Sequence, residues 1–144
     1  PKTRVFGVAD DLHYAVLGGR VPDWARRLTR ILHVNPVLTA SPEGKVGAAG
    51  AHPGRGANPK RLARTLLRKM RPEGVYRVLI SHANNPEGAR VVRQQILQNH
   101  GRIHSCHVTD ARPALGAHFG PGGLIAAFTP QPGALDRTDL RGRS

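Results

Sequence analysis

Apolar and polar positions follow two patterns along this chain, and each pattern predicts one type of element. Short runs rich in β-branched and aromatic residues predict strands over 3–9, 34–40, 75–81, 102–108 and 123–128. Apolar residues at helical spacing predict helices over about 10–17, 22–32, 59–71 and 87–100. The glycine- and alanine-rich stretch 46–58 indicates a loop or a weak strand. The resulting order predicts an α/β fold, a mixed β-sheet with packed helices.

The predicted boundaries carry residues that start or stop helices. We expect Asp10 to cap the first helix, which stops at Gly18-Gly19, and Asn85-Pro86 to begin the last one. Pro36 cannot donate a backbone hydrogen bond. The strand 34–40 is therefore expected at a sheet edge, or pairing late.

Two helices are amphipathic with arginine on their polar side. In the second helix the apolar positions Trp24, Leu28, Ile31 and Leu32 lie on one side, opposite three arginines. In the helix 59–71 an apolar face is accompanied by a basic stripe, which consists of Arg61, Arg64, Arg68 and Arg71. This stripe suits either a solvated helix face or a row of phosphate contacts.

Composition narrows the class of protein. The 144 residues match one domain, and the formal net charge of +13 calls for an anionic partner or surface. No apolar run is long enough to span a membrane, and no signal peptide is visible. The single cysteine, Cys106, favours a reducing cytoplasmic setting and a packing role. Residues 1–129 are expected to form the domain and 130–144 a disordered tail, and the missing start methionine indicates a fragment or a processed chain.

The patterns of enzymes and metal sites are missing from the sequence. The chain holds eight histidines, yet His104 and His107 have odd spacing and should point to opposite faces of a strand. The serines lack a nucleophile-elbow context, and Asp10-Asp11 is more simply explained as a helix cap than as a catalytic pair. We therefore expect no catalytic residue, no metal and no cofactor.

The stretch from His118 to Gly123 is the most unusual in the chain. Its glycines, including Gly120 and Gly122, predict a tight turn whose backbone N–H groups can approach a ligand, with His118 as a donor to an anion. Arg20 is a second candidate anion contact. A plain turn with an exposed histidine, and an arginine that packs on helix ends, are the structural alternatives.

Several of these pieces, taken in order, resemble the DegV family. Asp11-Leu12-His13-Tyr14-Ala15-Val16-Leu17-Gly18-Gly19-Arg20 resembles that family's Asp-x-Leu-x-Tyr-Leu and Gly-Gly-Arg. Leu32-His33-Val34-Asn35-Pro36-Val37-Leu38 is similar to Leu-Leu-x-Ile-Lys-Pro-Ile-Leu, with Asn35 in place of the usual lysine. The run from His118 to Leu124 resembles the closing His-x-Gly-Pro-Gly-Ala-Leu.

The resemblance covers only the second domain of a two-domain DegV-like fold. It implies a bacterial lipid-binding carrier that holds a long-chain fatty acid in an apolar tunnel between two domains. It also implies a fatty acid kinase as partner, and a missing N-terminal DegV domain that supplies further carboxylate contacts. His118, Gly120, Gly122, Arg20 and Arg55 would bind the ligand, and Arg55, Arg61 and Arg64 the kinase. The alternative is a basic nucleic-acid- or RNA-associated module, which the scarcity of aromatic residues disfavours.

Overall fold

The computed structural model describes residues 3–9, 12–19, 21–41, 43–54, 56–111 and 117–131. Six strands form one mixed sheet in the order β3-β2-β1-β6-β4-β5. The elements, in chain order, are β1 (Arg4–Val8), α1 (His13–Leu17), α2 (Asp23–Ile31), β2 (Val34–Ala40), β3 (Val46–Pro53), α3 (Pro59–Lys69), β4 (Tyr76–His82), α4 (Pro86–Asn99), β5 (Ile103–Asp110) and β6 (Leu124–Pro130). The predicted mixed sheet with packed helices is confirmed.

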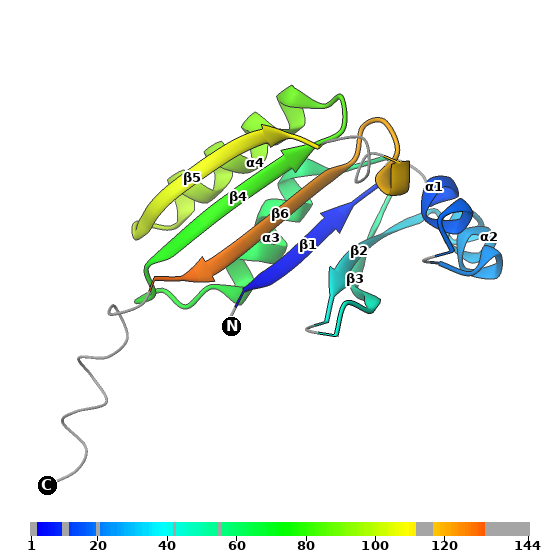
Figure 1. Ribbon diagram of the computed structural model, residues 1–144, viewed down its shortest axis with the longest axis horizontal. Coiled ribbons are helices and arrows are strands. Elements are labelled where there is room, and N and C mark those ends of the chain that lie inside the picture. Colours follow the sequence, from blue (N-terminus) through cyan, green and yellow to red (C-terminus); the bar gives the residue numbers. More distant parts are fainter. Residues whose placement is uncertain are drawn as a thin grey trace, which may run out of the picture.

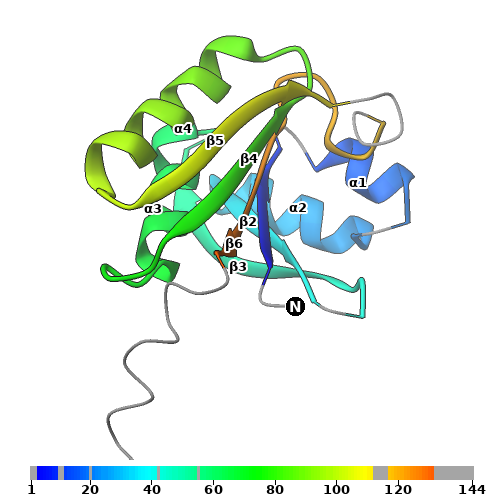
Figure 2. The ribbon, with the colours of Figure 1, turned by 60° about the vertical axis from the view of Figure 1, so that its left-hand side comes forward.

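The helices divide between the two faces of the sheet. Figures 1 and 2 show α3 and α4 covering one face, while α1 and α2 lie beyond the other at the β1–β2 end. The face under α3 and α4 is called here the helix face, and the other the open face. Among the described strands only β4 and β5 pair in parallel, and α4 provides the crossover between them.

The hydrophobic core lies between the helix face and α3 with α4. Alternate residues of the central strands point into it, because successive side chains of a strand face opposite ways. The largest fully buried side chains come from the three strands β1, β4 and β6 and from the two helices, and they are Leu62, Leu66, Ile80, Ile96, Leu124, Val8, Val78 and Val92. On the open face, Leu79 is 49% exposed although it sits between two buried neighbours.

Two asparagines fix the starts of the core helices. The Asn58 side chain accepts a hydrogen bond from the Arg61 N–H at 3.1 Å, and Asn85 accepts from the Gly88 N–H at 2.9 Å. Each is followed by a first-turn proline, whose missing N–H is one that the helix leaves unpaired anyway. Both predicted helices are confirmed to within two residues at each end.

The start of α1 differs from the expectation. The helix begins at His13, with Leu12 at the N-cap position and no side-chain cap bond. The predicted cap by Asp10 is therefore wrong in register, and Asp10 itself lies outside the described residues. The predicted end is confirmed, since Gly18 is the C-cap and Gly19 has a φ of +66°.

The region around Pro36 resolves the two alternatives left by the sequence. Strand β3 forms one edge of the sheet, and β2 lies inside it. Pro36 pairs with Ala51 of β3, whereas β2 pairs with β1 only through Leu38 and Thr39. Late pairing, and not an edge position, therefore accommodates the proline.

The amphipathic helix α2 buries none of its residues. Trp24 is 67% exposed and Ile31 is 73% exposed, and Leu28 and Leu32 are also exposed. Contiguous exposed apolar side chains of this size are typical of surfaces that another chain or domain covers. No helix among the described residues is long and apolar enough to cross a membrane.

The last described strand runs slightly past the predicted domain boundary. Strand β6 ends at Pro130, one residue beyond 129. The tail predicted for 130–144 falls, from residue 132 onward, outside the described residues.

Candidate ligand cavity and the glycines that shape it

The glycine-rich turn is fixed against the loop that follows β4. Gly120 and Gly122 have φ values of +69° and +88°, a region that glycine enters without steric strain. The Gly122 N–H donates to the Ala83 carbonyl at 2.7 Å, and the Asn85 side chain donates to the Gly122 carbonyl at 2.8 Å. The Gly122 N–H is therefore engaged within the protein, and its part in the turn is structural.

His118 meets the end of α1. A Cβ atom placed on Gly18 would overlap Nδ1 and Cε1 of the His118 ring, so the ring lies directly against the Gly18 backbone. Two motifs that are a hundred residues apart in the sequence are thus in contact. The His118 Nδ1 atom is buried and has no hydrogen-bond partner among the described residues, which is uncommon for a buried polar atom.

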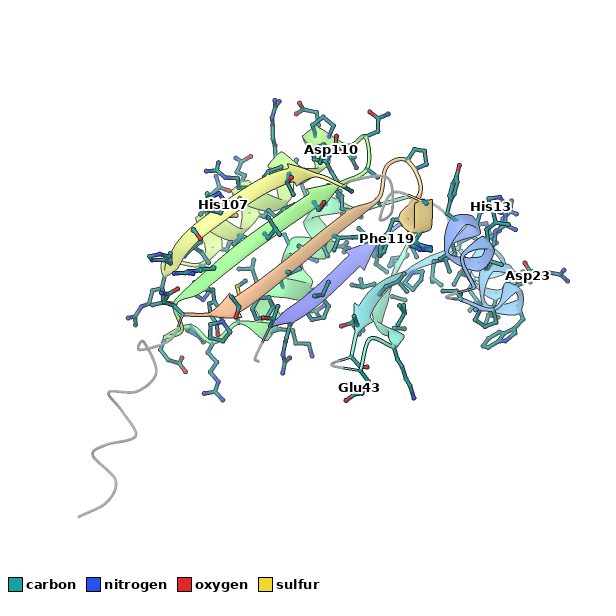
Figure 3. The ribbon with its side chains drawn as sticks, in the orientation of Figure 1. His13, Asp23, Glu43, His107, Asp110 and Phe119 are labelled. Atoms are coloured by element: carbon teal, nitrogen blue, oxygen red, sulfur yellow. The ribbon has the colours of Figure 1, made fainter. Side chains whose placement is uncertain are left out.

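Two further glycines receive aromatic rings of the same cluster. A Cβ on Gly120 would overlap the Tyr14 ring of α1, and a Cβ on Gly7 would lie 2.5 Å from Cε1 of Phe119. Phe119, labelled in Figure 3, lies between the sheet and α1, beside the end of β1. The absence of side chains at Gly7, Gly18 and Gly120 is what lets the turn and α1 close onto the sheet.

A small apolar cavity lies beneath this cluster on the open face. Its volume is about 210 Å³. It is lined mainly by Val5, Gly7, Leu38 and Ile125 from the sheet, Ala15 from α1, and His118 and Phe119 from the turn. The volume lies below the roughly 300–1,000 Å³ that is usual for a complete small-molecule site. The arrangement therefore has the character of part of a site, with an apolar floor and one imidazole.

Asn35 ties together two backbone segments that follow β1 and β3. Its side-chain NH₂ donates to the Ala9 carbonyl at 2.8 Å and to the Gly56 carbonyl at 2.7 Å, and the residue is buried. These carbonyls adjoin Asp10 and Arg55, which lie outside the described residues. Where the family motif has lysine, this chain therefore uses a neutral clamp.

The remaining predicted site residues are distributed unevenly. Arg20 and Arg55 lie outside the described residues. Arg61 and Arg64 lie on α3, which packs on the helix face, away from the cavity (Figure 2). Of the predicted ligand residues, His118 lines the cavity, and Gly120 lies against the Tyr14 ring of α1. Sequence reasoning missed Gly7, for which a glycine inside a strand was the available signal.

Cys106 and His107 both lie on β5, but their side chains have different surroundings. Burial raises the pKa of the Cys106 thiol, more than the nearby Arg93 charge lowers it. The side chain packs partly against the core, as predicted. His107 lines a groove on the open face next to Leu79, on the edge strand β5 (Figure 3). Within the described ranges, no three His, Cys, Asp or Glu residues gather as metal ligands would.

Comparison with known proteins identifies the family. The model of the family described as "Uncharacterised protein, DegV family" matches residues 1–130. The chain belongs to the DegV family. A DegV domain-containing protein of Streptococcus pneumoniae is 28% identical over 129 residues, a match that covers 90% of this chain and 45% of the relative. The chain thus spans about half the length of the curated relatives it matches.

Solved DegV structures share the fold. A fatty acid binding DegV family protein from Streptococcus agalactiae superimposes with a TM-score of 0.73 at 25% identity, over 90% of this chain and 45% of that one. The Fatty Acid Kinase (Fak) B3 protein of Streptococcus pneumoniae, loaded with linoleic acid, gives a TM-score of 0.72 at 16% identity, with 90% of this chain and 45% of that chain covered. The six-stranded unit is therefore one domain of the two-domain DegV fold.

Proposed function

We propose that this chain is the half of a fatty-acid carrier that supplies an apolar floor and a histidine for the ligand. The observation that carries the proposal is the contact of His118 with Gly18 above an apolar cavity. An acyl chain would occupy the cavity, and the ring would donate to its carboxylate. An imidazole that donates to a carboxylate forms a charge-assisted bond when it is protonated. The chain would perform no covalent chemistry itself.

The exposed apolar surfaces support a covering partner. The open face presents Leu79, and α2 presents Trp24 and Ile31, all strongly exposed. The chain spans about half of its relatives' length. We propose that the other half of the DegV fold covers part of these surfaces and completes the tunnel. Burial of apolar area of this kind contributes about 25 cal/mol per Å².

This chain alone should bind palmitate weakly, because one wall and part of the carboxylate contacts are absent. We expect a dissociation constant above about 1 μM, which corresponds to about −8 kcal/mol. Isothermal calorimetry of the 144-residue chain with palmitate measures it. Submicromolar binding would contradict the half-site and show that the described cavity opens into a complete one.

Within a protein containing both DegV halves, His118→Ala should weaken fatty-acid binding. The loss of one hydrogen bond to a charged group is worth about 1.5–3 kcal/mol. Native mass spectrometry of the purified protein, followed by calorimetry with palmitate, reports retention and affinity. His107→Ala, on the same face but at the far strand, is the matched control. If His118→Ala retains as much fatty acid as the unchanged protein, His118 does not bind the carboxylate.

We further propose that the carrier presents the acyl carboxylate to a partner kinase, with Arg61 and Arg64 at the docking surface. The linoleate-loaded Fatty Acid Kinase (Fak) B3 protein has this fold, which supports a link between the fold and a fatty acid kinase. Arg64 is exposed and Arg61 half-exposed on α3. Neither side chain lines the fatty-acid cavity. A surface charge of this kind steers association more than it sets the bound geometry.

Charge reversal at Arg64 should therefore lower kinase turnover while fatty acid stays bound. We expect Arg64→Glu to reduce coupling on the order of tenfold at low salt, and less at high salt. Lys45→Glu, in the exposed β2–β3 turn, makes the same charge change as a control. Acyl-phosphate formation with the kinase is the measurement. Submicromolar binding of duplex DNA or structured RNA at physiological salt, without lipid in the whole protein, would overturn the carrier.

A further inference from the structure

A second and larger cavity opens where β1 and β2 separate. The two strands pair through Phe6–Thr39 and Gly7–Leu38, and the described pairing stops there. Toward the start of β1 and the end of β2 the ribbons diverge (Figure 1). A cleft of about 920 Å³ fills the gap, bounded by β1, β2, the C-terminal end of α3 and the end of β6. Its volume is within the range of about 300–1,000 Å³ typical of small-molecule sites.

The rim of this cleft is basic. Arg4, Lys69 and Arg71 line it, and its described lining contains no aspartate or glutamate. Among the described residues, the ion pairs are Asp23 with Arg27 and Glu87 with Arg90, so these three cations are not paired with a described carboxylate. Uncompensated like charges around a concave surface focus a positive potential. An anion that enters the cleft relieves their mutual repulsion.

The backbone of Arg71 is held in place from both sides. Its N–H donates to the Tyr76 hydroxyl oxygen at 2.8 Å, and its carbonyl lies 3.1 Å from Nε2 of His100. Tyr76 and His100 are both buried, and their rings meet edge to face with centroids 5.4 Å apart. The chain therefore leaves α3 along a fixed path, which brings Arg71 to the cleft from a well-supported position.

The floor of the cleft is apolar and partly aromatic. Val5, Phe6, Ala49 and Phe128 contribute to it. The rings of Phe6 and Phe128 are stacked with centroids 6.3 Å apart and an interplanar angle of 16°. A ligand that combines an anionic group with an apolar one matches this rim and this floor. A free inorganic anion would leave the floor uncovered.

We propose that this cleft binds a phosphate monoester whose alcohol part is apolar or aromatic. Three cations match the charge of a phosphate dianion better than that of a single carboxylate, and the arginine fork fits phosphate oxygens bidentately. The site is separate from the fatty-acid cavity in its chemistry. The two cavities share a wall at Val5, Phe6, Thr39 and Ala40, but His118 lines only the smaller one.

Phenyl phosphate is the probe, titrated into the 144-residue chain and followed by backbone amide NMR and calorimetry. It should bind at least about tenfold more tightly than either inorganic phosphate or benzoate, because inorganic phosphate lacks the apolar group and benzoate lacks the phosphate. We expect amide shifts at Arg4, Tyr76 and Arg71. If inorganic phosphate binds as tightly as phenyl phosphate, the apolar floor does not contribute to ligand binding and the proposal is wrong. Benzoate binding as tightly would overturn the phosphate preference.

Variants test the rim. Arg71→Ala should weaken phenyl phosphate about 10- to 100-fold through the loss of a charge-assisted hydrogen bond, and its backbone bonds to Tyr76 and His100 remain possible. Lys69→Ala is the second rim variant. Arg64→Ala, on the same helix but outside the cleft lining, should change affinity less than about twofold. Equal losses in Arg71→Ala and Arg64→Ala would show diffuse charge attraction and overturn the site. Palmitate binding should be unaffected by Arg71→Ala, so the two proposals fail separately.

Discussion

Replacing Ile80 with alanine is expected to lower the free energy of unfolding by about 2–5 kcal/mol. Ile80 is 0% exposed on β4, where it packs with the helix-face core. Truncation removes three carbons and leaves a cavity that neighbouring side chains refill only partly. Urea unfolding followed by circular dichroism measures the change. A typical domain has a total stability of about 5–15 kcal/mol, so the effect is a large fraction of it.

The adjacent residue supplies the control. Leu79 lies on the open face of the same strand and is 49% exposed. Leu79→Ala should lower stability by about 1 kcal/mol or less. Ile80→Val, at about 0.5–1.5 kcal/mol, keeps the comparison measurable if Ile80→Ala does not fold. Equal losses at the two positions would contradict the assignment of one buried and one open face.

Replacing Gly7 with valine should abolish measurable fatty-acid binding in the protein with both DegV halves. A Cβ at this position lies 2.5 Å from Cε1 of Phe119 and 3.3 Å from the Leu124 carbonyl oxygen. The added side chain would occupy the floor of the cavity and push the Phe119 ring away. Valine is a good strand former, so the backbone tolerates it. Overpacking of this kind costs about 1–3 kcal/mol in stability, and the cavity volume is lost in addition.

A second substitution tests whether the clash with Phe119 causes the effect of Gly7→Val. Phe119→Ala removes the ring that the new side chain meets. The double variant should therefore lose less free energy of unfolding than the sum of the losses in the two single variants, with a coupling of about 0.5–3 kcal/mol. Gly47→Val is the matched control, because Gly47 also lies in a strand and a Cβ there meets nothing within 4 Å. Calorimetry with palmitate and thermal unfolding report binding and stability. Full binding by Gly7→Val would show that the acyl chain lies elsewhere.

The two core helices show how far local chemistry reaches. Asn85 caps α4 as the sequence predicts, and Asn58 caps α3 in the same way, since an asparagine before a proline satisfies free N–H groups within one turn. At α1 the same reasoning selected Asp10, yet the helix starts at His13. That helix has five residues and depends on the burial of Ala15 and on the contact of Tyr14 with the turn at Gly120. Tertiary packing therefore decides its register.

By itself the sequence determined most of the elements, the buried face of α3 and the candidate turn at His118, because spacing, caps and glycines act over a few residues. It left 46–58 open between a loop and a weak strand, and the structure forms β3 there. The order of the strands, the edge position of β3 and the open face depended on pairing between distant segments. Likewise, only the tertiary structure brought His118 onto Gly18 and Phe119 onto Gly7, and placed both Arg4 and Arg71 in the lining of one cleft. Contacts of this kind join segments that are far apart in the sequence and form only when the whole core packs. They therefore leave no local pattern from which they can be predicted.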